Sequence, residues 1–134
     1  MSAAPLTGNC LCGALRYECG QPVSAAAFCH CQSCRRAAGA HVVVWMTVSL
    51  ASFRFTGGTP AQYASSPPVI RQFCARCGSQ ITYWHEKAPD TIDVTVATLD
   101  RPGMIPPADH IWMSDAVAWD QITDGRPAHP AGRT

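Results

Sequence analysis

The sequence has few charged residues. Only 14% of its 134 residues are Asp, Glu, Lys or Arg, against a usual share of about 25%. The net charge is +1 and no basic run is present, so the chain lacks the positive surface on which nucleic-acid-binding proteins depend. A weakly charged surface also leaves apolar area that a ligand or a partner subunit can cover, which favours a homodimer.

The sequence also lacks a long apolar run. The longest lies near residues 42–46, whereas a helix that spans a bilayer needs about 20 apolar residues. Residues 1–5 have neither a charged n-region nor an apolar h-region, so we expect no signal peptide. We therefore expect a cytoplasmic protein without a membrane partner. Thiols stay reduced there, which favours metal binding over disulfides.

Cysteine is abundant, and most of the eight cysteines are clustered. The pair at 74–77 reads C-x-x-C-G, a turn that supplies two of the four ligands of a structural zinc. The pair at 10–12 reads C-x-C-G and is its natural partner. Joining the pairs predicts a site made of Cys10, Cys12, Cys74 and Cys77. Zinc binding by thiolates is worth roughly 10 kcal/mol or more, so we expect the fold to depend on this site.

A third motif, C-x-C-x-x-C, contains Cys29, Cys31 and Cys34. Alternate residues of a strand share a face, and a tight turn can return the third sulfur to the first two. Three sulfurs without a fourth cysteine predict a second zinc with an open position, as in catalytic sites. Two alternatives remain: His30, His41 or His85 completes the site, or the cysteines form disulfides. Cys19 is left over and is expected to be a buried free thiol.

Short alternating segments and many turn residues predict a mainly β single domain. We expect strands at 14–19, 23–30, 41–48, 53–55, 62–65, 69–73, 80–84 and 91–98. The strand at 41–48 is expected to be central and buried on both faces. Residues 32–38 predict a short helix that ends at Gly39. The domain is expected to span 8–127, between a disordered leader at 1–7 and a frayed tail at 128–134.

Four segments together resemble a known family: GNCLCGALRY at 8–17, CHCQSCRR at 29–36, FCARCGS at 73–79 and HIW at 110–112. The chain resembles the glutathione-dependent formaldehyde-activating enzymes, a family that includes centromere protein V-like proteins, from about residue 8 to 127. The resemblance implies a zinc-stapled β-tent (Mss4-like) fold of short antiparallel strands. It also implies two zinc ions per chain, a structural one on the four cysteines and a reactive one on the three.

The activity that the resemblance implies is that of a zinc-dependent carbon–sulfur lyase. In the namesake reaction, formaldehyde and glutathione form S-hydroxymethylglutathione, so a small-molecule thiol or its aldehyde adduct is the expected partner. Cys29, Cys31 and Cys34 would hold the zinc that binds the thiol, and a zinc-bound thiol is deprotonated. The alternatives are a zinc-scaffolded binding module and a carrier of glutathione adducts, both without catalysis.

Basic side chains near the motifs are candidates for binding the carboxylates of a glutathione-like ligand. Arg35 and Arg36 directly follow the three-cysteine motif, and Arg71 precedes the last cysteine pair. The alternative interpretation of these arginines is a solvated surface. His30 lies between two ligands and is expected to point to the other face of its strand. Trp45 and Trp112 are expected to belong to the core.

Overall fold

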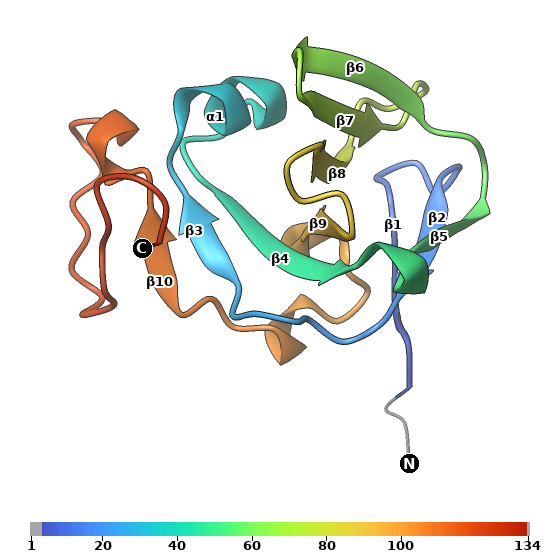
Figure 1. The fold of residues 1–134 in the computed structure, drawn as a ribbon, viewed down its shortest axis with the longest axis horizontal. Helices are drawn as coiled ribbons and strands as arrows, with labels where there is room; N and C mark the ends of the chain where they lie inside the picture. Colours follow the sequence, from blue (N-terminus) through green and yellow to red (C-terminus); the bar gives the residue numbers. More distant parts are fainter. Residues whose placement is uncertain (1–3, 134) are drawn as a thin grey trace.

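The computed structural model describes residues 4–133, which form two β-sheets and one short α-helix (Figure 1). The elements follow in the order β1 (Leu6–Asn9), β2 (Arg16–Cys19), β3 (Ala27–Cys29), α1 (Gln32–Ala38), β4 (Val43–Ser49), η1 (Leu50–Ser52), β5 (Arg54–Gly57), β6 (Ala61–Ser66), β7 (Val69–Phe73), β8 (Gln80–His85), β9 (Thr91–Thr95), η2 (Val96–Thr98), η3 (Pro102–Met104), β10 (Asp109–Ile111) and η4 (Met113–Asp115), where η marks a 3₁₀ helix. The predicted mainly β class is confirmed.

The larger sheet has seven strands in the order β10-β3-β4-β9-β8-β7-β6, and the smaller has the order β1-β2-β5. Every neighbouring pair is antiparallel except β3 and β10, which are parallel. The parallel pair departs from the expected antiparallel arrangement. It forms because a long connection separates the two strands, so β10 can return alongside β3 in the same direction.

Strand β4 is central, and both of its faces are covered, as predicted. Met46 and Val48 are completely buried in the main core, which joins side chains of both sheets. Val43 and Trp45 face a second, smaller core that contains Cys29 and Cys34. The strand therefore separates the structural core from the region of the three-cysteine motif.

The helix α1 lies where the sequence predicts it. Cys31 caps its first turn, because the Cys31 sulfur accepts a hydrogen bond from the Cys34 backbone N–H at 3.3 Å. Gly39 ends the helix in the left-handed conformation with φ of 64°, and its N–H donates to the Arg35 carbonyl. In Figure 1, α1 lies between the end of β3 and the β6–β7 hairpin.

Both predicted disordered ends need correction. Strand β1 begins at Leu6, which is buried, so the leader does not extend to residue 7; residues 1–3 lie outside the described part. The predicted frayed tail is instead bound along β10. The His129 N–H donates to the His110 carbonyl, and the Arg133 guanidinium pairs with Asp109. Asp109 is buried, and a buried carboxylate needs a counter-charge, which holds the tail in place.

Of the two tryptophans predicted to belong to the core, one does and one does not. Trp45 is 7% exposed and belongs to the core, as expected. Trp112 is 40% exposed and has a φ of 58°, so the core assignment is wrong for it. The left-handed backbone turns the chain between β10 and η4, and Trp112 lines a cavity of about 500 Å³ instead of the core. Among the described residues, no helix is long and apolar enough to cross a membrane.

Candidate metal centres

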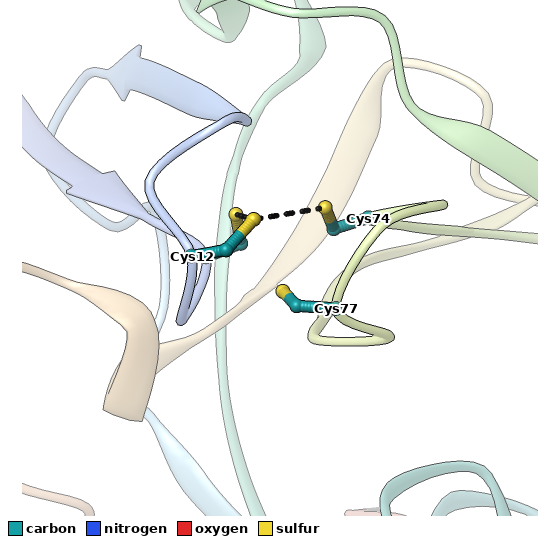
Figure 2. Close-up of side chains that lie close together, drawn as sticks. Cys12, Cys74 and Cys77 are labelled. Carbon is teal, nitrogen blue, oxygen red and sulfur yellow. Dashed lines mark hydrogen bonds between the residues drawn. The ribbon is translucent and has the colours of Figure 1, made fainter.

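The first and last cysteine pairs form one cluster of four sulfurs, as predicted. Two turns that are far apart in the sequence present Cys10, Cys12, Cys74 and Cys77 to a common point. Figure 2 shows the side chains of Cys12, Cys74 and Cys77 pointing toward one another. The Cys12 sulfur lies 3.6 Å from that of Cys10 and 3.8 Å from that of Cys74. Tetrahedral zinc with Zn–S bonds near 2.3 Å places its sulfurs about 3.8 Å apart. The donor set and its spacing therefore fit a metal ion such as zinc.

The two turns have the hydrogen bonds of zinc knuckles. The Cys10 sulfur accepts from the Leu15 N–H at 3.3 Å, and Gly13 and Gly78 both adopt positive φ where each turn closes. Ser79 links the turns, since its hydroxyl accepts from the Leu11 N–H at 3.0 Å. The same hydroxyl and the Ser79 backbone lower the pKa of Cys77 to about 5. This cysteine is therefore ready to bind a metal as a thiolate.

The three-cysteine motif forms the second cluster, with all three sulfurs within 4.8 Å of one another. Cys29 lies at the end of β3, Cys31 caps α1, and Cys34 belongs to the first turn of the helix. Cys29 and Cys34 are each 4% exposed, and Cys31 is half-buried. The local geometry explains the convergence: a strand that runs directly into a helix brings positions 29, 31 and 34 to one side. Three thiolates fit a metal such as zinc with one position left for an external ligand.

No histidine completes the second cluster within residues 4–133. The donor groups found there are the four cysteines and the three cysteines alone. His30 points to the opposite face of its strand, where its Nε2 lies 2.9 Å from Nδ1 of His110. The predicted orientation of His30 is therefore confirmed. All eight cysteines are free thiols, and the leftover Cys19 is buried as expected.

A cavity of about 500 Å³ opens beside the three sulfurs. Its lining comprises Cys29, Cys31, Gln32, Ser33, Cys34, Trp45, Ser65, Ser66, Val69, Arg71, Tyr83, Asp93, Ile111, Trp112 and Asp115. These residues come from the larger sheet, the helix α1 and the segment after β10. The cavity is of the size that binds small molecules.

Arg71 is the cation of this cavity. Its side chain is buried, and one guanidinium nitrogen lies 3.7 Å from the Cys34 sulfur. Ser65 and Gln80 accept hydrogen bonds from the other guanidinium nitrogens at 3.0 Å, and the Tyr83 ring lies 5.0 Å below the group. Hydrogen bonds from Cys29 and Cys31, and then the charge of Arg71, lower the pKa of Cys34 to about 2.

The other two arginine candidates lie elsewhere on α1. Neither Arg35 nor Arg36 lines the cavity, so their role in ligand binding stays a prediction. Asp93 and Tyr83 line the cavity, although neither belongs to a motif that the sequence reveals. Asp93 lies between the buried residues Ile92 and Val94 of β9, so its side chain points to the opposite face of the strand. A carboxylate in this alternating pattern could have indicated a polar site on that face.

The comparisons with known proteins agree with this geometry. The family model described as glutathione-dependent formaldehyde-activating enzyme matches residues 5–115. A crystal structure of a Rhodobacter sphaeroides protein, a structural genomics target, is similar with a TM-score of 0.61 and 27% identity. The match covers 70% of this chain and 87% of that one. The search of curated proteins found no match. Together with the two cysteine clusters, the family match confirms the expected β-tent (Mss4-like) fold.

Proposed function

Because the chain belongs to the glutathione-dependent formaldehyde-activating enzyme family, we propose that it is a zinc-dependent carbon–sulfur lyase. The proposed substrate is the adduct of a glutathione-like thiol with a small aldehyde, or the two separate reactants. One observation supports this most strongly: three clustered cysteine sulfurs border a cavity of about 500 Å³, and no further side chain of residues 4–133 completes the ligand set.

The two clusters are proposed to hold zinc for different purposes. Cys10, Cys12, Cys74 and Cys77 would hold a structural ion with all four positions filled by the chain. At the second cluster, the metal would supply an open coordination position at which a substrate thiol loses its proton. Cys29, Cys31 and Cys34 would hold this ion, and the cavity beside them would receive the thiol.

Arg71 has two proposed tasks beside the three cysteines. Three thiolates around a divalent cation leave a formal charge of −1, and the buried guanidinium next to Cys34 offsets it. Because Ser65 and Gln80 fix the guanidinium in one orientation, Arg71 can also orient a carboxylate of the ligand at low entropic cost.

Asp93 is the proposed proton carrier. When a thiol adds to an aldehyde, a carbon–sulfur bond forms and the carbonyl oxygen becomes a hydroxyl, so the proton that leaves the sulfur must reach that oxygen. Burial raises the pKa of Asp93, and the Thr47 hydroxyl donates to its Oδ1 at 2.7 Å. Oδ2 is therefore the oxygen left to hold the proton and pass it into the cavity.

The test measures the rate at which S-hydroxymethylglutathione forms and breaks, by NMR exchange spectroscopy with and without the zinc-loaded protein. The protein should accelerate the exchange, and Cys31→Ser should remove the acceleration while one zinc stays bound. Cys19→Ala, which removes a thiol outside both clusters, should keep full activity. X-ray absorption should show an additional sulfur ligand when glutathione is added.

A protein that binds the adduct without accelerating its exchange would be a carrier, and the enzyme proposal would then be wrong. A second zinc with a fixed protein ligand, unchanged by glutathione, would identify a binding module instead.

A further inference from the structure

The residue that follows strand β10 has an unfavourable backbone conformation. Trp112 has φ of 58° and ψ of 39°, and it is the one residue other than glycine with positive φ in the described part of the chain. The left-handed conformation brings Cβ too close to the following carbonyl oxygen, so it costs free energy for most residues, whereas glycine adopts it freely and Asn or Asp adopt it more readily. A turn of this shape alone would therefore favour glycine at position 112.

Burial does not account for the tryptophan either. Trp112 is 40% exposed and belongs to neither hydrophobic core. A tryptophan normally stabilises a fold by burying its large apolar side chain, and this one leaves much of that area uncovered. Strained residues are concentrated at functional sites. Trp112 lines the cavity beside the three cysteines, so a ligand bound in that cavity can contact it.

The C-terminal segment holds this conformation in place. Three consecutive N–H groups, those of residues 112–114, donate to the carbonyls of residues 129–131 at 3.0–3.2 Å. Asp115 accepts a hydrogen bond from the Gln32 N–H at 3.1 Å, which ties η4 to the first turn of α1. A strained conformation persists only where the surrounding contacts fix it. Trp112 is therefore held in one position relative to α1, the helix that carries Cys34.

Trp112 and Arg71 border the cavity from distant parts of the larger sheet. Trp112 follows β10 at one edge and Arg71 belongs to β7, while β3, β4, β9 and β8 lie between these two strands. Because β3 carries Cys29, a ligand whose sulfur lies at the three cysteines can extend toward Arg71 on one side and toward Trp112 on the other. The cavity of about 500 Å³ has room for a ligand larger than a two-carbon thiol.

The chemistry of indole indicates which group of the ligand Trp112 would contact. An indole ring offers a broad apolar face, on which a planar group can stack, and one N–H donor. A peptide amide is planar and carries a carbonyl acceptor, so it can use both features. An alkyl thiol such as 2-mercaptoethanol has no planar group and gains little from the ring.

We propose that Trp112 is the specificity-determining residue of this cavity: its indole contacts an amide group of the bound thiol, so the site prefers peptide thiols to simple alkyl thiols. The inference rests on the proposed function, since the thiol must bind beside Cys29, Cys31 and Cys34. It adds the residue that selects the thiol and the chemical class that is selected.

The test measures the affinity of the zinc-loaded full chain for glutathione, which contains peptide amides, and for 2-mercaptoethanol, which contains none. Trp112→Asn introduces a residue that tolerates the left-handed turn. It should weaken glutathione binding by about 3- to 10-fold, as expected for one aromatic contact, and leave 2-mercaptoethanol binding unchanged. Trp112→Phe keeps an aromatic face and should retain most of the preference for glutathione.

Trp119→Asn is the matched control, because Trp119 is also exposed but does not line this cavity. It should leave both affinities unchanged. A second measurement uses the wild-type protein labelled with ¹⁵N, in which the spectrum of Trp112→Phe identifies the indole N–H signal of Trp112. Glutathione should shift this signal in a saturable way.

An equal loss of affinity for both thiols in Trp112→Asn, or no loss for either, would overturn the proposal. Should this variant fail to fold or to keep both metal ions, the wild-type spectrum decides, since a Trp112 signal that saturating glutathione leaves unmoved rules out the contact. A wild-type protein that binds neither thiol would refute the proposed function together with this inference. Full turnover in a Trp112→Asn protein that still binds glutathione as tightly as wild type would refute this inference alone.

Discussion

Replacing Cys77 by Ser tests how far the fold depends on the four-cysteine cluster. Cys77 is the suitable position because it is only half-buried, so the change removes a metal ligand and little packing. The cluster joins Cys12 and Cys74, which are 62 positions apart in the sequence. By the loop-closure relation used for disulfides, a link of this length is worth about 4 kcal/mol through the entropy of the unfolded chain.

The expected change in Tm follows from this loop-closure free energy of about 4 kcal/mol. Each kcal/mol shifts the Tm of a domain of this size by about 4 °C, so loss of the link alone should lower Tm by about 15 °C. Complete removal of the metal with a chelator should go further, because the roughly 10 kcal/mol of zinc binding is comparable to the whole stability of a domain, about 5–15 kcal/mol. The wild-type chain should then unfold.

The assay combines zinc content by mass spectrometry with thermal unfolding followed by circular dichroism. Cys19→Ala is the matched control, because Cys19 is buried but belongs to neither cluster. It should cost about 1 kcal/mol through the lost sulfur and keep both metal ions. Retention of the structural ion by Cys77→Ser, or a Tm within about 3 °C of wild type, would refute the dependence of the fold on this cluster.

Three further predictions concern other parts of the molecule. Cys29→Ser should keep the structural zinc, lose the second ion and abolish turnover, with Tm close to wild type, as measured by metal analysis and the exchange assay. Arg71→Gln should weaken binding of an anionic thiol about 10-fold or more, measured by calorimetry, because it removes the one cation that lines the cavity within residues 4–133. Arg133→Met should lower the free energy of unfolding by about 1–2 kcal/mol, less than for a fully buried pair since Arg133 is 36% exposed. Arg133 lowers the pKa of Asp109. The stabilisation is therefore present above the usual Asp pKa of about 3.9 and is lost as the pH falls through the lower pKa of the folded state. In urea unfolding measured at a series of pH values, Arg133→Met should reduce the loss of unfolding free energy at acid pH.

The metal clusters were predictable because cysteine spacing encodes local geometry. A C-x-x-C-G turn positions two sulfurs by its own backbone, and a strand that runs into a helix does the same for Cys29, Cys31 and Cys34. The boundaries of α1 were equally local: Cys31 caps the first turn, and Gly39 ends the last in a conformation that glycine adopts at little cost. These features need no knowledge of distant residues.

The features that the sequence analysis missed depend on distant pairings. Strand β10 has three residues and no clear alternation, so its parallel pairing with β3 leaves no periodic signal. The attachment of the tail depends on the burial of Asp109, which in turn depends on that pairing. Asp93 and Tyr83 reach the cavity because β8 and β9 pair in one register, with Tyr83 opposite Asp93. A single sequence shows the residue types but not the register.

The alternation of side chains along β3 separates two cavities, one beside the three cysteines and one of about 290 Å³ that Phe28 and His30 line. Cys29 and His30 are adjacent in the chain, yet one faces the sulfur cluster and the other a chain of polar side chains. The backbone N–H of His30 also donates to the Ile111 carbonyl, so β10 holds the backbone that carries the cysteine ligands. A change at His110 or Asp124 should therefore disturb the polar side chains around His30 first, and the second metal cluster only through the backbone. Changes at Cys34, on α1, should leave the cavity beside His30 intact, since no residue of that helix lines it.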